Sequence, residues 1–155
     1  MKKNRGFTLI ELLVVIAMIA IITAVALPNL YNRKNVNDLK NVVAQIGTLL
    51  RQAQTDSMLQ ENGAAWGVRF QNATNTSPFF ALFTNSYSTT TRSSYFSLPN
   101  DVGYVTSTLP SGSFYDVIFS PIIGTTTSTN ISLYLKNLPS QVMTISIAST
   151  GAVSF

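Results

Sequence analysis

The chain has 155 residues and few charges, because Asp, Glu, Lys and Arg make up only 10% of it, against about 25% in average soluble domains. It contains no Cys and no His, which excludes disulfides, thiolate chemistry and the commonest general base and metal ligand. Much of the net charge of +4 comes from Lys2, Lys3 and Arg5. The basic character therefore belongs to the N-terminus and not to a nucleic-acid-binding face, and we expect no nucleic-acid partner for the main body.

Residues 7–27 form an apolar segment that contains one charged residue, Glu11. A helix of this length would be about 30 Å long, which matches the hydrocarbon core of a bilayer. The cations that precede it favour an N-terminus in the cytoplasm. The pattern therefore predicts one membrane-spanning helix over residues 7–28, in contact with membrane lipid.

A cleavable secretory signal is the alternative interpretation of this segment. Ala24-Val25-Ala26 resembles a signal-peptidase site, and cutting there would leave an exported soluble protein that begins at Leu27. The apolar stretch is longer than the usual 7–15 residues or so, and a signal peptide gains nothing from Glu11. Both features favour the membrane helix.

Glu11 needs a physical explanation, because a carboxylate near the middle of a membrane helix costs about 2.5–3.5 kcal/mol, and less near an end. Its side chain would reach the headgroups and benefit from the positive end of the helix dipole. Alternatively, it would pair with a cation that another chain supplies.

Gly6-Phe7-Thr8-Leu9-Ile10-Glu11 and the apolar residues after it resemble the processing and assembly motif of type IV prepilins and type II secretion pseudopilins. The basic leader, the glycine, the phenylalanine and the glutamate all match, and Pro28 falls where many members carry a helix-kinking proline. The resemblance implies a pilin-like α+β fold. It also implies a structural subunit of a type IV pilus or of a type II secretion-like pseudopilus, and not an enzyme.

The resemblance also implies roles for individual residues. A prepilin peptidase would cut between Gly6 and Phe7, remove residues 1–6 as a leader peptide and N-methylate Phe7. Glu11 would then pair with the Phe7 amine of an adjacent subunit. Because an unpaired ion in an apolar environment is costly, this pairing would favour one register between the subunits. The implied partners are the peptidase, other pilin or pseudopilin subunits and the inner-membrane assembly platform. The protein would lie in the cytoplasmic membrane and then in a periplasmic or cell-surface filament.

Residues 29–61 are predicted to continue the helix as an amphipathic second half. Pro28 would bend the helix, and Asn62-Gly63 would end it, so that the helix would extend from about Phe7 to about Gln60. The apolar positions recur at intervals of three and four residues and define one face: Leu39, Val42, Val43, Ile46, Leu49, Leu50 and Ala53.

Residues 62–155 are rich in Ser, Thr, Asn and aromatic residues and read as a β-rich head. β-branched and aromatic runs alternate with turn residues. They predict an antiparallel sheet on the helical face, with strands over residues 66–70, 79–84, 102–105, 115–119, 131–135, 142–148 and 152–155. We expect its aromatic residues to form the core: Trp66, Phe70, Phe79, Phe80, Phe83, Tyr104, Phe114 and Phe119.

No catalytic, cofactor-binding or metal-ligating pattern is apparent in the head. Its acids Asp101 and Asp116 are isolated in sequence. A filament-tip minor subunit that binds DNA or secreted cargo is the alternative function, since residues 51–54 and Trp66-Gly67-Val68 loosely resemble minor subunits of the GspH/FimT kind. The C-terminal residues 151–155 lack the arginines of the DNA-binding members, and without cations DNA capture loses its electrostatic contribution.

Overall fold

The structure is a computed structural model that describes residues 7–155, without the side chains of residues 25–32. The chain divides into two compact units, Met1–Asn35 and Val36–Phe155. One long helix, α1 (Leu9–Met58), contributes to both units. Antiparallel strands complete the second unit, so the predicted α+β class is confirmed. The leader predicted for residues 1–6 lies outside the described residues.

The C-terminal end of α1 is set by residues that adopt a left-handed backbone. Gln60, Asn62 and Gly63 have φ angles of 53°, 57° and 63°, and the last two belong to the short 3₁₀ helix η1 (Glu61–Gly63). Glycine adopts this conformation without steric cost, and asparagine tolerates it better than most residues do. The helix stop predicted at Asn62-Gly63 is therefore confirmed, while both helix ends lie about two residues inside the predicted bounds.

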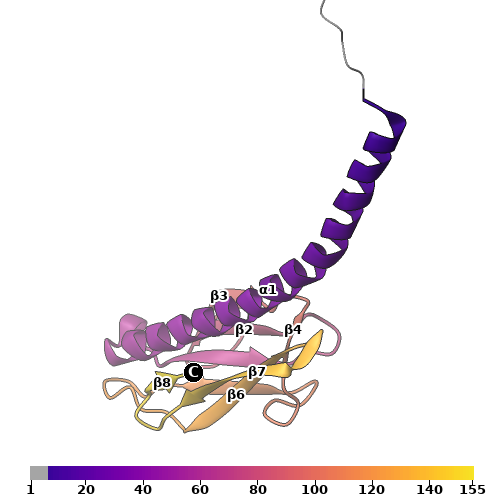
Figure 1. Cartoon of the computed structure of the whole chain (residues 1–155). Helices are drawn as coiled ribbons and strands as arrows, with labels where there is room; N and C mark the ends of the chain where they lie inside the picture. The colour runs from indigo at the N-terminus through magenta and orange to yellow at the C-terminus, as the bar shows by residue number, and fades with distance from the viewer. Residues whose placement is uncertain (1–6) are drawn as a thin grey trace, which may run out of the picture. The chain divides into compact units, whose positions relative to one another are not determined.

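The amphipathic half of α1 packs its apolar face into the core of the second unit (Figure 1). All seven residues predicted for this face are buried, and Ile46, Leu50 and Ala53 are completely so. Removing a Leu or Ile side chain from water contributes about 1.5–3 kcal/mol. This stripe therefore holds α1 on the strands.

The strands form two four-stranded antiparallel sheets (Figure 1). The first sheet has the order β3 (Arg92–Ser97), β2 (Phe79–Thr84), β1 (Trp66–Gln71) and β5 (Phe114–Ile118). The second has the order β4 (Val102–Tyr104), β6 (Thr129–Leu135), β7 (Leu138–Ile147) and β8 (Val153–Ser154).

The predicted antiparallel arrangement is therefore confirmed, and the structure adds that its strands are divided between two sheets. After β3 the chain turns at Pro99, whose carbonyl accepts from the Val102 amide at 3.0 Å. β4 then pairs with β6, which comes later in the chain, and β5 returns to the free edge of β1. Helix and both sheets share one hydrophobic core, so burial alone does not reveal which strand edges meet.

β3 is the strand that the sequence pattern missed. Its residues Arg-Ser-Ser-Tyr-Phe-Ser are mostly polar and partly exposed, as suits the edge of a sheet. Two of its rings contact β2: Phe96 stacks on Phe80 at a centroid separation of 5.4 Å, and Tyr95 lies 4.7 Å from Phe79. Pairing with β2, rather than intrinsic propensity, makes this segment a strand.

The aromatic core is confirmed with one exception. Phe114 is 55% exposed, because it begins the edge strand β5 and its ring lies against a guanidinium group instead of entering the core. The other predicted aromatic residues are buried: Trp66, Phe70, Phe79, Phe80, Phe83, Tyr104 and Phe119.

Candidate functional site

The N-terminal segment holds the site residues that the sequence analysis identified. Gly6 lies outside the described residues, whereas Phe7 is the first described residue and its side chain is 80% exposed. α1 begins two residues later, at Leu9. Phe7 therefore lies two residues before the start of the helix.

Thr8 and Glu11 cap the first turn of α1 reciprocally. The Thr8 amide donates to Glu11 Oε2 at 3.5 Å, and the Glu11 amide donates to Thr8 Oγ1 at 3.4 Å. A threonine followed three residues later by a glutamate is the sequence pattern of this cap, and a carboxylate in the first turn also complements the helix dipole. Glu11 therefore has a role within its own chain, and its predicted pairing with another subunit stays a prediction.

The first part of α1 is apolar except at Glu11 and Thr23. All the side chains described between residues 7 and 24 are exposed within the chain, including Leu9 at 82% and Ile21 at 67%. Thr23 does not interrupt this surface with a free hydroxyl, since its Oγ1 donates to the carbonyl of Ile19 at 2.8 Å. So much exposed apolar surface is unfavourable in water.

Two further findings concern the segment predicted to span a membrane. Among the described residues, no helix has a stretch long and apolar enough to cross a membrane. Pro28 lies within α1, but its side chain is among those that the structure does not describe. The helix kink at Pro28 therefore stays a prediction.

The two aspartates of the head each have a hydrogen-bonding partner. Asp116 on β5 accepts two hydrogen bonds of 2.6 Å from the Arg69 guanidinium on the neighbouring strand β1. Asp101 accepts from the Asn137 side-chain amide at 3.2 Å. Within the described part of the chain, no group of three or more acids could hold a metal ion.

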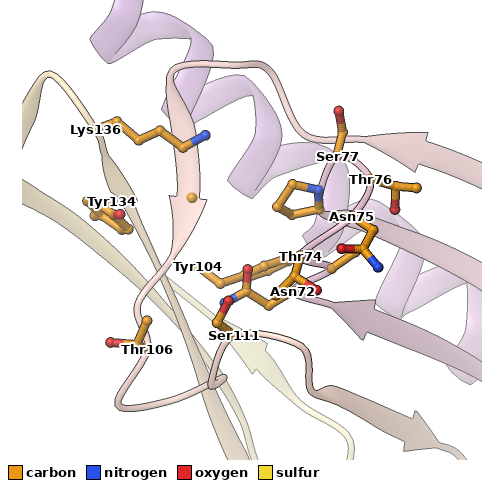
Figure 2. Close-up of a pocket in the computed structure, with 13 residues that line it drawn as sticks. Asn72, Thr74, Asn75, Thr76, Ser77, Tyr104, Thr106, Ser111, Tyr134 and Lys136 are labelled. Carbon is orange, nitrogen blue, oxygen red and sulfur yellow. The ribbon is translucent and has the colours of Figure 1, made fainter.

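A polar cleft in the head was missed by the sequence analysis. It has a volume of about 750 Å³, and the loop between β1 and β2 lines one side of it (Figure 2). Tyr134 and Lys136, at the end of β6, line the other side. Gly103 of β4 also lines the cleft. A Cβ at Gly103 would lie 3.0 Å from the Tyr134 ring, so the absence of a side chain there lets that ring lie against β4.

The only sequence signal for this cleft was the polar run of residues 72–77, which contains two N-x-S/T triplets. That run is uninformative by itself, because such triplets are common in chains rich in Ser and Thr. Tyr134 and Lys136 follow it by about sixty residues, and only the sheet topology brings them to the same cleft.

Comparisons with known proteins find a family match in the N-terminal segment. Residues 1–27 match the family described as "Prokaryotic N-terminal methylation motif". Over 39 residues the chain is 62% identical to the type IV wide pilus major component PilA4 of Thermus thermophilus, a match that covers 24% of this chain and 30% of that relative. No solved structure matches the chain.

These two matches show that part of the chain is similar to an N-terminal methylation motif and to a type IV pilus component. The matched family segment includes Gly6, Phe7 and Glu11, the residues on which the resemblance was based. The chain spans less than a third of the relative's length in this match.

Proposed function

We propose that this protein is a structural subunit of a type IV pilus or of a type II secretion-like pseudopilus, polymerised through its N-terminal helix. The observation that carries the proposal is the methylation motif followed by a helix whose described side chains from Leu9 to Ala24 are all exposed. So many exposed apolar residues are unfavourable in water. Packing the helices of neighbouring subunits together would bury this surface.

Before assembly, residues 7–28 span the cytoplasmic membrane with the N-terminus in the cytoplasm. The support is the apolar sequence of the whole segment, which includes residues 25–28 whose side chains lie outside the description, together with the three cations in front of it. Membrane lipid covers the helix at this stage, and the inner-membrane assembly platform then transfers it into a filament.

Prepilin peptidase cuts between Gly6 and Phe7 and methylates the new Phe7 amine. Cleavage converts the Phe7 nitrogen into an α-ammonium that lies four residues before Glu11. In a low-dielectric filament core, the Glu11 carboxylate of one subunit binds the Phe7 amine of the next, because each ion alone would be costly to bury. The pairing thereby sets the register between subunits.

Mass spectrometry of the protein purified from its natural host tests the processing step. We expect a mature chain that begins at a methylated Phe7. A first residue at Leu27 would contradict the proposal, because an ordinary signal peptidase would then have released a soluble exported protein.

The pairing is tested by Glu11→Ala. We expect leader removal to remain largely intact while incorporation into sheared filaments falls, because the variant leaves the Phe7 amine of the neighbouring subunit without its counter-ion. Immunoblots of sheared filaments measure incorporation, and immunoblots of the membrane fraction measure leader removal. Normal incorporation of the variant would disprove the pairing.

A further inference from the structure

The cleft beside β4 has walls that are held in place by internal hydrogen bonds. The buried Asn72 donates its side-chain Nδ2 to the Leu109 carbonyl at 2.9 Å. The buried Tyr104 hydroxyl donates to the Phe79 carbonyl at 3.0 Å. These two polar groups are therefore used within the fold and fix the positions of two side chains that line the cleft.

The rim of the cleft, in contrast, carries unused hydrogen-bonding groups. Six of its side chains make no hydrogen bond with any other residue that the structure describes: Thr74, Asn75, Thr76, Ser77, Thr106 and Ser111. They come from the β1–β2 loop and from the segment that follows β4, and Figure 2 shows them around the cleft. Each hydroxyl can both donate and accept, and the amide offers two donors and an acceptor.

A second Ser/Thr-rich loop of the head behaves differently. In residues 86–91 the Ser88 hydroxyl lies 2.9 Å from both the Thr90 and the Thr91 hydroxyls, and Thr91 also donates to the Ser86 carbonyl at 2.6 Å. These bonds pair the hydroxyls of Ser88, Thr90 and Thr91 within the loop, whereas none of the six cleft side chains is paired in this way.

One cation and one aromatic ring complete the cleft. Lys136 is the only charged residue that lines it, among the residues that the structure describes, and Tyr134 lies on the same side. The nearby Asp101 carboxylate accepts from Asn137. The cleft therefore combines a positive charge, a flat ring and a set of neutral hydrogen-bonding groups.

This chemistry matches a sugar that carries a carboxylate. Sugar hydroxyls exchange hydrogen bonds with Ser, Thr and Asn side chains, the ring of Tyr134 offers an apolar surface with a polar tip, and the ammonium of Lys136 forms a charge-assisted hydrogen bond with the carboxylate. Nucleic acids fit less well, because their affinity comes from neutralising several phosphates and the cleft holds a single cation among the residues described. We propose that the cleft binds an acidic saccharide, a function separate from filament assembly.

Binding of an oligogalacturonate to the full chain in detergent micelles tests the proposal, with a neutral galactose oligomer of the same length for comparison. We expect the acidic oligomer to bind more tightly than the neutral one. Lys136→Met should weaken that binding about tenfold or more, the scale of one charge-assisted hydrogen bond. Tyr134→Ala should weaken binding of both oligomers, and Tyr134→Phe should retain most of it.

Lys40→Met is the matched control, because Lys40 is an exposed cation on α1 that does not line the cleft. It should leave affinity unchanged, and thermal unfolding of both Lys variants verifies that they are folded. The proposal is overturned if oligogalacturonate does not bind, or if Lys136→Met and Lys40→Met lose the same affinity for it. It is also overturned if a single-stranded DNA oligomer binds more tightly than oligogalacturonate.

Discussion

Thr8 and Glu11 face each other across the first turn of α1, where each backbone amide donates to the other residue's side-chain oxygen. The arrangement gives Glu11 two separable properties: an oxygen that caps the helix and a negative charge. Only the charge is available to attract an ammonium group from a second subunit. Variants can therefore separate capping from assembly.

We predict that Glu11→Gln impairs filament incorporation nearly as strongly as Glu11→Ala does, although glutamine preserves the cap. Thr8→Ala, which keeps the charge and removes the capping hydroxyl, should cost about 1 kcal/mol of helix stability and leave incorporation close to normal. Quantifying each variant in sheared filaments tests this prediction. If Glu11→Gln is incorporated normally and Thr8→Ala is not, the role of Glu11 is capping and not pairing.

The ion pair between Arg69 and Asp116 stabilises the head. The two side chains are only 15% and 21% exposed, and the guanidinium carbon lies 4.2 Å and 3.9 Å from the ring centroids of Tyr87 and Phe114. Asp116→Asn should lower the free energy of unfolding by about 1–3 kcal/mol, because the bidentate charge-assisted pair is lost. Asp101→Asn, at an exposed hydrogen bond, should change it by less than about 0.5 kcal/mol. Urea denaturation followed by Trp66 fluorescence measures both, and equal effects would contradict the prediction.

Ser57 connects the end of α1 to two strands of the first sheet. Its completely buried hydroxyl donates to the Phe119 carbonyl at 2.6 Å and accepts from the Trp66 amide at 3.4 Å. Ser57→Ala leaves both buried backbone groups short of a partner and should cost about 1–3 kcal/mol. The control is Thr55→Ala, because that exposed hydroxyl bonds only to Arg51 in its own helix. A shift in the melting temperature no larger than that of the control would disprove the role of Ser57.

Tyr104 should make stability depend on pH in the alkaline range. Burial raises the pKa of its phenol far above the ordinary value of 10.0, so the folded chain retains a proton that the unfolded chain releases. The unfolded state then binds fewer protons, and the free energy of unfolding falls with rising pH above about 10, by up to about 1.4 kcal/mol per pH unit. Below that pH the contribution of Tyr104 is fully present.

Tyr104→Phe should make the free energy of unfolding fall less steeply with pH above about 10, because the variant lacks the one proton that Tyr104 contributes. It also removes the hydrogen bond to the Phe79 carbonyl, which lowers stability by about 1 kcal/mol at neutral pH. The slope is therefore the informative quantity. Urea denaturation of both proteins at a series of pH values supplies it, and identical slopes would contradict the prediction.

Features that depend on residues close together in the chain were predictable. The seven buried positions from Leu39 to Ala53 follow the helical period, and the helix stop at Asn62-Gly63 follows local backbone preference. The methylation motif is likewise contiguous. The strands other than β3 were located by their β-branched and aromatic content and by the turns between them, because such side chains favour a pleated and half-buried surface.

The sequence pattern did not reveal the edge strand β3, the division into two sheets, the pair between Arg69 and Asp116 or the polar cleft. Each depends on which strand edges meet. Antiparallel pairing of β1 with β5 places Arg69 opposite Asp116, 47 positions away, and pairing of β4 with β6 places Tyr134 opposite Gly103. Local propensity shows that a segment can be extended, whereas its partner and register are chosen by the shared core. The N-terminal motif and the helical stripe are thus readable from residue order, and the arrangement of the head's polar side chains comes from long-range pairing.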